Sequence, residues 1–252
     1  ELGLDTKFFK NRLGLDIALY RSSTTNQIIS LDIDPIVGAS SMRINVGEIT
    51  NKGIEVSMYA TPVKTSDFTW NLNFNWAANR NTLVSLHESL DPSQPYKHDM
   101  GTTIGGRLHL YSYVGQEMYQ LYGFALKRAP EGSFYTDNNG ERVDCSGQVL
   151  IDATTGLPSV ESTADHFLGK VNPDWKGGFG TSLRYRNLSL SALFSYQMGG
   201  HRFSVTHGIL SYQGKLTNSL EGRYDGIVAE GVNMTGTGEA ATFQPNNTVT
   251  NS

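Results

Sequence analysis

The stretch F-T-W-N-L-N-F-N-W-A-A, residues 68–78, decides the fold of this chain. Successive side chains of an extended strand point to opposite faces, so this stretch has one apolar, aromatic face and one face of uncharged polar groups. The apolar face carries Phe68, Trp70, Leu72, Phe74, Trp76 and Ala78. The polar face carries Thr69, Asn71, Asn73 and Asn75. A strand with two such faces suits a wall that separates lipid from water.

The length of this stretch fits a membrane crossing. Its residues rise by ~3.3 Å each, and a tilt of about 40° lets them cover roughly 28 Å, enough for the ~25 Å apolar band of an outer-membrane barrel. A strand of a soluble β-sandwich also alternates, but its outward face usually carries charge. We therefore predict a transmembrane β-strand.

The same alternation recurs in three other stretches, residues 13–20, 54–61 and 188–197. In the first, Leu13, Leu15, Ile17 and Leu19 share one face. In the second, Ile54, Val56, Met58 and Ala60 do so. In the third, Leu188, Leu190, Ala192, Phe194 and Tyr196 do so. A pattern that repeats along the chain predicts a sheet of such strands.

Short and long connections alternate between these strands. The short ones are residues 10–11, 62–67 and 186–187. The long polar ones are residues 23–51, 80–113, 129–175 and the chain from 199 onward. Outer-membrane barrels place short turns on the periplasmic side and long loops outside, whereas a Greek-key sandwich has no reason to alternate them. The pattern therefore favours a barrel.

The short turns also constrain the number of strands. If all three are periplasmic, an even number of strands separates the strand that ends near Ala78 from the one that starts near Gly177. Residues 107–113 and 118–127 are the obvious pair, with a turn or a mid-strand bend between them. We therefore predict an all-β, antiparallel transmembrane arc of about eight strands.

Composition excludes several classes of protein. Of 252 residues only 17% are charged, 27 are glycine, and the net charge is −4, so no basic surface indicates nucleic acid. Cys145 is the single cysteine, which gives no disulfide frame and no metal quartet. No apolar run is long enough for a transmembrane helix, although barrel strands need none. Both ends of the chain look like cuts in a longer protein, and we therefore expect this chain to be a fragment.

Three motifs could carry chemistry, and each has a simpler interpretation. Residues 137–141, D-N-N-G-E, could hold calcium, but Asn139-Gly140 is also a strong hairpin signal, and the EF-hand positions are not met. Residues 177–180, G-G-F-G, lack the ending of a phosphate loop and indicate strand entry. Trp70 and Trp76 could stack on sugar, but their common face favours lipid. We predict no catalytic residue, metal or cofactor.

Several blocks resemble the SusC/RagA-type TonB-dependent outer-membrane transporters. They are N-V-G-E-I-T-N-K-G-I-E-V-S-M (45–58), W-N-L-N-F-N-W-A-A-N-R-N (70–81), V-G-Q-E-M-Y-Q-L-Y-G-F (114–124), G-K-V-N-P-D-W-K-G-G-F (169–179) and Y-R-N-L-S-L-S-A-L-F-S-Y-Q-M-G-G (185–200). Family members carry them in this order in the later part of the barrel. An acidic loop common before the fourth block is eroded here to residues 137–141.

The resemblance implies that residues 1–252 are part of a large plugged barrel in the cell outer membrane. Such proteins are not enzymes; they import nutrients, typically glycans or oligopeptides. A SusD-like surface lipoprotein lids the outer face, and TonB supplies energy through an N-terminal region outside this sequence. Residues 80–113 and those from 199 onward would form the vestibule for the nutrient ligand and the docking surface for the lipoprotein.

The two faces then have different roles. The candidates for lining the lumen and meeting substrate are Glu55, Ser57, Asn71, Asn73, Asn75, Ser191, Ser195 and Gln197. The candidates for facing outer-membrane lipid are Phe68, Trp70, Leu72, Phe74, Trp76, Leu190 and Phe194. Two alternatives stay open: a soluble secreted β-sandwich that binds carbohydrate, and a secreted all-β hydrolase with a buried carboxylate pair.

Overall fold

The structure, a computed structural model, describes residues 1–32, 36, 38–39, 41–86, 91–98 and 108–250. The chain divides into two compact units. Unit 1 comprises Glu1–Asp99, Leu110–Leu121 and Leu168–Arg202. Unit 2 comprises Met100–His109, Tyr122–Phe167 and Phe203–Ser252. Each unit is described by itself.

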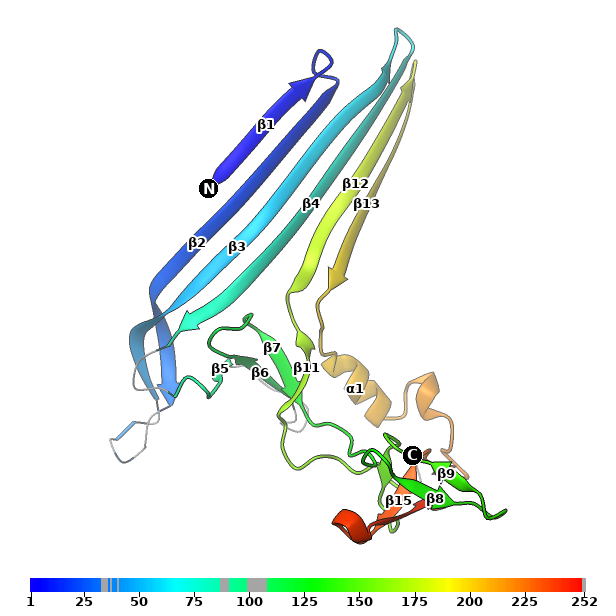
Figure 1. Ribbon diagram of the computed structural model, residues 1–252. Coiled ribbons are helices and arrows are strands. Elements are labelled where there is room, and N and C mark those ends of the chain that lie inside the picture. Colours follow the sequence, from blue (N-terminus) through cyan, green and yellow to red (C-terminus); the bar gives the residue numbers. More distant parts are fainter. Residues whose placement is uncertain (33–35, 37, 40, 87–90, 99–107, 251–252) are drawn as a thin grey trace. The chain divides into compact units, whose positions relative to one another are not determined.

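Unit 1 is built on one six-stranded sheet in the order β1-β2-β3-β4-β12-β13 (Figure 1). Its strands are β1 (Leu2–Phe8), β2 (Leu13–Asp32), β3 (Ser41–Lys64), β4 (Phe68–Ser85), β12 (Pro173–Tyr185) and β13 (Leu188–Gly199). Every neighbouring pair is antiparallel. This confirms an all-β, antiparallel arc that does not close on itself within this chain.

The tight turns lie at one end of the sheet (Figure 1). Phe8 pairs with Leu13, so the first turn is residues 9–12, longer than the two residues that the sequence predicts. Its Phe9, Lys10 and Asn11 all have positive φ, of 52°, 55° and 63°. The turn at 186–187 has the predicted two residues, because Tyr185 pairs with Leu188. The chain returns at the opposite end through the long connections.

The prediction of about eight spanning strands is wrong for the described sheet, because β4 pairs directly with β12. The expected pair instead forms β6 (Leu108–Ser112) and β7 (Gln120–Gly123), which belong to a small sheet of order β11-β7-β6-β5. Its other strands are β5 (Tyr96–His98) and β11 (His166–Lys170). Strands of four or five residues at ~3.3 Å each are too short to cross a ~25 Å band. Residue 107 lies outside the described residues.

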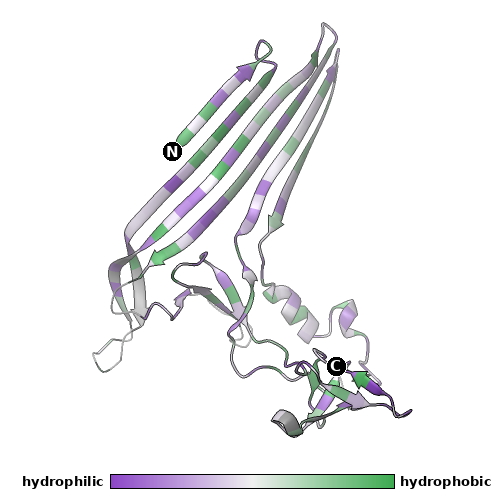
Figure 2. Ribbon diagram, viewed as in Figure 1, coloured by the Kyte–Doolittle hydropathy of each residue, from purple (hydrophilic) through white to green (hydrophobic). Residues whose placement is uncertain are grey.

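The pairing register carries the two-faced pattern across the whole sheet. Leu15, Met58, Phe74, Phe179 and Phe194 are successive partners, one on each strand from β2 to β13. One residue along, the row is Asp16, Ser57, Asn75, Gly178 and Ser195. Figure 2 shows the resulting alternation of hydrophobic and hydrophilic residues along the strands. The period of two read from the sequence is therefore confirmed, and so is its register.

Glycines opposite tyrosines set the packing on the polar face of β2 and β3. Gly14 pairs with Tyr59, and six residues along, Tyr20 pairs with Gly53. A Cβ atom on either glycine would overlap the ring of its partner tyrosine. Each ring thus lies over the backbone of the neighbouring strand, where only glycine leaves room. Gly53 belongs to the N-K-G-I-E block, and its contact with the Tyr20 ring explains why this position of the block is glycine.

The apolar face ends in a row of cations. Arg21 pairs with Lys52, and Lys52 pairs with Arg80, so three basic side chains stand side by side on β2, β3 and β4. All three are exposed. They follow the row of Leu19, Ile54 and Ala78 at the end of the sheet away from the tight turns.

Unit 2 has its own small core. Its strands are β8 (Phe134–Thr136), β9 (Arg142–Asp144), β10 (Leu150–Ile151), β14 (Ile227–Val228), β15 (Val232–Thr235), β16 (Thr242–Pro245) and β17 (Val249–Thr250). Its helices are α1 (Val205–Tyr212) and the short η3 (Thr217–Ser219) and η4 (Gly238–Ala240). The buried cluster is Ala129, Cys145, Leu150, Val232 and Phe243.

Among the described residues, no helix is both long and apolar enough to cross a membrane.

Candidate functional site

The polar face of the six-stranded sheet is the candidate site. The structure places all the predicted lumen-lining residues on this face: Glu55, Ser57, Asn71, Asn73, Asn75, Ser191, Ser195 and Gln197. The predicted lipid-facing residues lie on the opposite face: Phe68, Trp70, Leu72, Phe74, Trp76, Leu190 and Phe194. The sheet thus separates the two sets completely. Which set meets lipid and which meets substrate stays a prediction.

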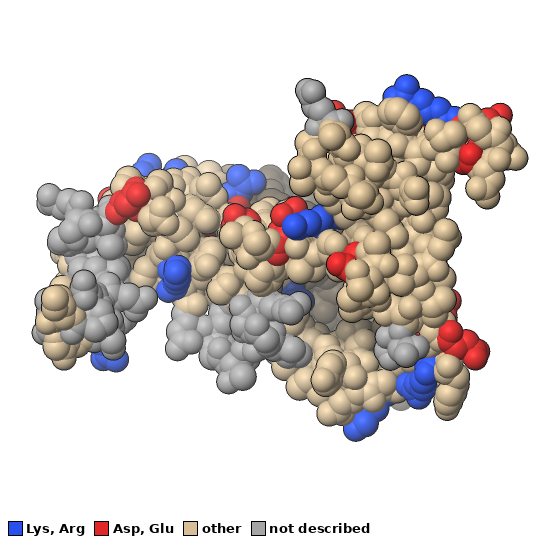
Figure 3. All heavy atoms as spheres, turned by 90° about the horizontal axis from the view of Figure 1, so that it is seen from below, with Lys and Arg blue, Asp and Glu red and all other residues tan. Residues whose placement is uncertain are grey.

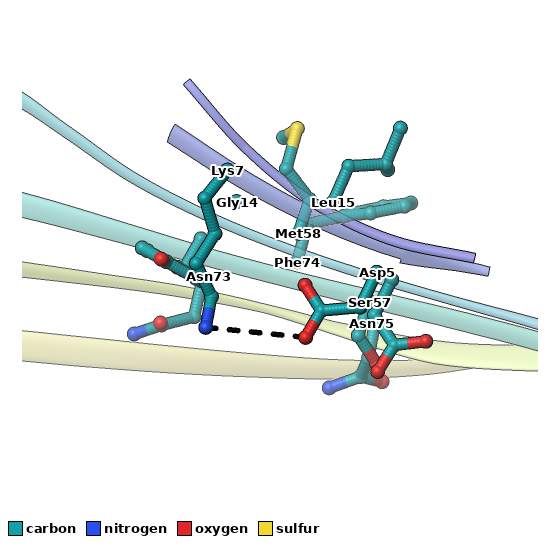
Figure 4. Close-up of a pocket in the computed structure, with 11 residues that line it drawn as sticks. Asp5, Lys7, Gly14, Leu15, Ser57, Met58, Asn73, Phe74 and Asn75 are labelled. Atoms are coloured by element: carbon teal, nitrogen blue, oxygen red, sulfur yellow. Dashed lines mark ion pairs between the residues drawn. The ribbon is translucent and has the colours of Figure 1, made fainter. Parts of the chain in front are cut away.

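A groove of about 460 Å³ crosses the polar face over β1–β4. Its polar side chains come from every strand that it crosses: Asp5, Lys7, Asp16, Ser57, Tyr59, Asn73 and Asn75. In Figure 4, Leu15, Met58 and Phe74 extend from the other side of the same strands. The groove is therefore a polar trough on one face of a sheet whose other face is apolar.

The groove carries one ion pair and a row of amides. Lys7 Nζ lies 3.9 Å from Asp5 Oδ2, and both side chains are more than half exposed (Figure 4). An exposed pair at this separation contributes little to stability, so both charges are available to a ligand. The amides of Asn73 and Asn75 add donors and acceptors without net charge. This chemistry suits a neutral, hydrogen-bonding ligand such as a peptide backbone or a sugar.

Two neighbouring hollows extend the polar surface toward β12 and β13. One of about 420 Å³ is lined by Asn75, Lys176, Ser195 and Gln197. The other, of about 200 Å³, brings Glu55 together with Tyr20, Lys176 and Trp175. Six of the eight predicted residues thus line the groove or a hollow on this face: Glu55, Ser57, Asn73, Asn75, Ser195 and Gln197.

Hydrogen bonds hold part of each face in place. On the polar face, Thr61 Oγ1 donates to Asn71 Oδ1 at 2.9 Å, and Asn71 Nδ2 donates to Ser182 Oγ at 3.5 Å. On the apolar face, the indole Nε1 of Trp70 donates to Thr181 Oγ1 at 3.0 Å. The Trp70 ring therefore lies on the apolar face with its one polar atom hydrogen-bonded.

Sequence reasoning missed several charged residues of the polar face. Asp5, Lys7, Asp16 and Lys176 all line its hollows. The signal for two of them was present, because residues 2–8, L-G-L-D-T-K-F, alternate in the same way as the longer strands. These residues give the polar face charges of both signs. Figure 3 shows acidic and basic side chains scattered among uncharged ones on the surface seen from below.

A second, smaller pocket of about 200 Å³ lies on the same face at the end away from the tight turns. Tyr96, His98 and Tyr119 line it together with aliphatic side chains of β3 and β4. No local sequence pattern indicates this pocket, because its three rings come from two segments that come together only in the folded chain. Burial lowers the pKa of His98, which favours the neutral imidazole.

Tyr119 has an unusual backbone, with φ of 65°. A left-handed conformation costs a residue with a side chain about 1–2 kcal/mol. Two hydrogen bonds hold it there: Tyr119 N–H donates to Ser112 Oγ at 3.0 Å, and the carbonyl of Tyr119 accepts from Val171 N–H at 2.9 Å. The strained residue is therefore fixed from both sides.

A half-buried cation lies beside this segment. Lys170 Nζ is 3.0 Å from Glu117 Oε2 and 2.7 Å from Asp174 Oδ1. The hydrogen bond to Asp174, and then that to Glu117, raise the pKa of Lys170. The cluster joins β11 to the start of β12 and to the segment that runs along β4, where Met118 N–H donates to Asn81 O at 2.9 Å. Its role is to tie these segments together.

The two remaining motifs have structural explanations. Residues 137–141 form the turn of the β8–β9 hairpin, in which Asp137 Oδ1 accepts from the N–H groups of Asn139 and Glu141, and Gly140 has φ of 84°. The glycines at 177, 178 and 180 lie inside β12. Across the residues that the structure describes, no group of three His, Cys, Asp or Glu is placed to hold a metal ion.

Comparisons with known proteins agree on one family. The family model described as "TonB dependent receptor-like, beta-barrel" matches residues 1–251. TonB-dependent receptor P3 of Formosa agariphila is 27% identical over 213 residues, which cover 82% of this chain and 20% of that protein. TonB-dependent receptor SusC of Bacteroides thetaiotaomicron is 30% identical over 174 residues, 62% of this chain and 17% of that protein.

Solved structures agree on the fold. A structure of the RagAB peptide importer in the open-open state has a TM-score of 0.54 and 21% identity, and covers 79% of this chain and 20% of that chain. A structure of the RagAB peptide transporter has a TM-score of 0.52 and 21% identity, with 77% and 20% covered. This chain spans about a fifth of the length of the relatives that it matches.

Proposed function

Because this chain belongs to the TonB-dependent receptor-like β-barrel family, we propose that it forms one arc of the wall of a nutrient importer. The family's SusC and RagA-like members are outer-membrane proteins, and so is the protein to which this chain belongs. Its relatives are receptors and transporters rather than enzymes. The arc contributes a polar face to the import path and an apolar face to the membrane.

The observation that carries this proposal is the separation of the two faces. In water, the apolar side chains of β13 have no cover: Leu188 is 74% exposed, Leu190 68% and Phe194 60%. Lipid would cover them, because hydrocarbon is their preferred surroundings. The soluble sandwich and the hydrolase have no support in a sheet built this way, since both need a core that this face would have to enter.

The nutrient, in this proposal, is a glycan or an oligopeptide. Neutral amides, hydroxyls and charges of both signs on the polar face suit ligands rich in hydrogen-bonding groups. The chains named RagAB in the structural comparison transport peptides, and this supports the peptide class. A SusD-like lipoprotein would dock on the long connections, and TonB would supply energy through a part of the protein outside this chain.

The import proposal is tested in a strain that lacks the whole gene. Uptake of radiolabelled oligopeptides and of oligosaccharides is compared between this strain and the parent, with and without a protonophore. We expect the deletion and the protonophore to abolish uptake of one class. Unchanged uptake of both classes in the deletion strain would overturn the proposal.

The face assignment has its own test in the full-length protein. Ser57→Cys and Met58→Cys, neighbours on β3 with opposite faces, are compared in a cysteine-free background. A membrane-impermeant maleimide should label Cys at 57 and leave Cys at 58 unreacted in intact outer membranes. Labelling of both positions, or of position 58 alone, would contradict the assignment.

A further inference from the structure

The small pocket at the end of the polar face away from the tight turns has an aliphatic floor. Ile49 pairs with Leu83 across β3 and β4, on the same face as Asn75. Leu83 is 3% exposed and Met118, which lies beside them, is 5% exposed. These side chains offer no hydrogen-bonding group to a ligand. The floor therefore differs from the amide-lined groove further along the same face.

The rim of the pocket is aromatic. The His98 ring lies 4.8 Å from the Tyr96 ring in an edge-to-face arrangement, and 4.8 Å from the Tyr119 ring. These separations are those of contacting aromatic side chains. The three rings form one cluster of contacting aromatic groups, and this cluster lines the pocket together with the aliphatic side chains.

One buried hydroxyl positions this rim. Ser112 is fully buried, and its Oγ lies 2.7 Å from His98 Nε2 and accepts from Tyr119 N–H at 3.0 Å. Tyr119 keeps its left-handed backbone, a conformation in which glycine would fit without strain. Strain that the surroundings hold in place is typical of residues at ligand-binding sites. The chain thus maintains a tyrosine ring at a position where backbone energy favours glycine.

We propose that this pocket binds an apolar side chain, above all an aromatic one, of a peptide that enters the import path. This deepens the import function proposed above and rests on it. The described lining residues include no Asp, Glu, Lys or Arg, so the pocket suits an uncharged group. Its volume of about 200 Å³ matches one side chain rather than a whole ligand.

A sugar ring fits this pocket less well. Hydroxyl groups placed on Ile49, Leu83 and Met118 would lose their hydrogen bonds to water and gain none in return. The Nε2 atom of His98 already has Ser112 as its partner. A phenyl ring loses no hydrogen bond in the same place and packs against the tyrosine rings. Gln27, Tyr96 and Tyr119 bring polar groups to the lining, but the aliphatic floor itself favours a phenyl ring over a sugar.

The test uses the purified full-length protein and three probes: the peptides Ala-Phe-Ala-Ala and Ala-Ala-Ala-Ala, and maltotetraose. Binding is measured by calorimetry for the parent protein and for Tyr119→Gly. This variant removes the ring and relieves the backbone, so a loss of binding is not a loss of folding. Arg186→Gly, which relieves a positive φ of 50° in the turn far from the pocket, is the matched control.

We expect the parent and Arg186→Gly to bind the Phe peptide about 10-fold or more tightly than the Ala peptide. In Tyr119→Gly the preference should fall to about 2-fold or less, with an unchanged or higher thermal midpoint. Three outcomes would overturn the proposed role of the pocket. The parent protein could bind the two peptides equally, it could bind neither, or Tyr119→Gly could keep the preference for the Phe peptide.

The parent protein could instead bind maltotetraose more tightly than either peptide, and Tyr119→Gly could weaken that binding. This result would also overturn the proposal, because the occupant of the pocket would then be a sugar. Uptake in the gene-deletion experiment reports separately on import. A functional importer without the Phe preference would therefore refute this inference alone.

Discussion

The six-stranded sheet and unit 2 deal with apolar side chains in opposite ways. On β13, Leu190 and Phe194 are 68% and 60% exposed, whereas in unit 2 Val232 is 1% exposed and Cys145 is fully buried. Unit 2 gathers its apolar groups into a core, as a fold in water must. The sheet spreads them over one face. This difference is what we expect of a chain whose elements are built for two solvents, hydrocarbon and water.

A charge in the core of unit 2 should have the largest effect. Val232→Asp in the full-length protein would bury a carboxylate without a partner among Ala129, Leu150 and Phe243, at a cost of about 3–5 kcal/mol. Hydrogen exchange should then accelerate in β10, β15 and β16 while β4 stays protected. Thr235→Asp, exposed on the same strand, is the control. Equal acceleration in β4 would show that the two regions unfold as one.

A charge on the apolar face of the sheet comes next. Leu72→Arg should destabilise the protein in lipid by about 2–4 kcal/mol if Leu72 faces the middle of the bilayer. Asn73→Arg, its neighbour on the polar face, should cost much less. Unfolding of both variants by denaturant in lipid vesicles measures the difference. Equal costs would contradict the assignment of faces.

Close packing on the polar face gives a smaller effect. In Gly53→Ala the new Cβ would overlap the Tyr20 ring, which must move, at a cost of about 1–3 kcal/mol. In Gly180→Ala the new Cβ would lie 3.4 Å from Leu193 Cδ1, an ordinary contact. Thermal unfolding in detergent should therefore separate these two variants. Similar midpoints would show that Tyr20 does not hold its position over Gly53.

The smallest effect concerns the cation row at the end of the apolar face. Lys52 stands between Arg21 and Arg80, and like charges directly opposite on neighbouring strands repel. In an uncharged detergent at low salt, Lys52→Gln should raise stability by about 0.3 kcal/mol, and high salt should remove the gain. Lys10→Gln, in the turn at the other end, should show no gain. A loss of stability in Lys52→Gln would mean that a bound anion already relieves the repulsion.

The two faces of the sheet could be predicted because the face of each side chain depends only on the local sequence pattern. Alternation along residues 68–78 assigns each side chain to a face whichever strand is its neighbour, and the register confirms it. The number of strands depended on long-range pairing, which no local pattern encodes. Leu108–Ser112 and Gln120–Gly123 have the composition of strands but are too short to span, and only the direct pairing of β4 with β12 shows where they belong.

The residues of the candidate site likewise fall into those that the local sequence predicts and those that it does not. The amide ladder at Asn73 and Asn75 was readable from one strand. Asp5 and Lys7 were equally readable but lay in a shorter stretch. The pocket rim was not readable, because Ser112 joins His98 to Tyr119 by hydrogen bonds that depend on the folding of β5 beside β6. Neither the positive φ of Tyr119 nor its ring contact leaves a trace in the local sequence.

The direct pairing of β4 with β12 has a consequence for how such a chain can evolve. Strands β1 to β4 follow one another as hairpin neighbours, but β12 meets β4 only after residues 86–172 have been passed over. The entropy lost in closing a loop grows only with the logarithm of its length, by about 0.6 kcal/mol for each doubling. Insertions and deletions in this connection therefore change the energy of the wall very little. New recognition surfaces can be acquired there without redesign of the sheet that carries them.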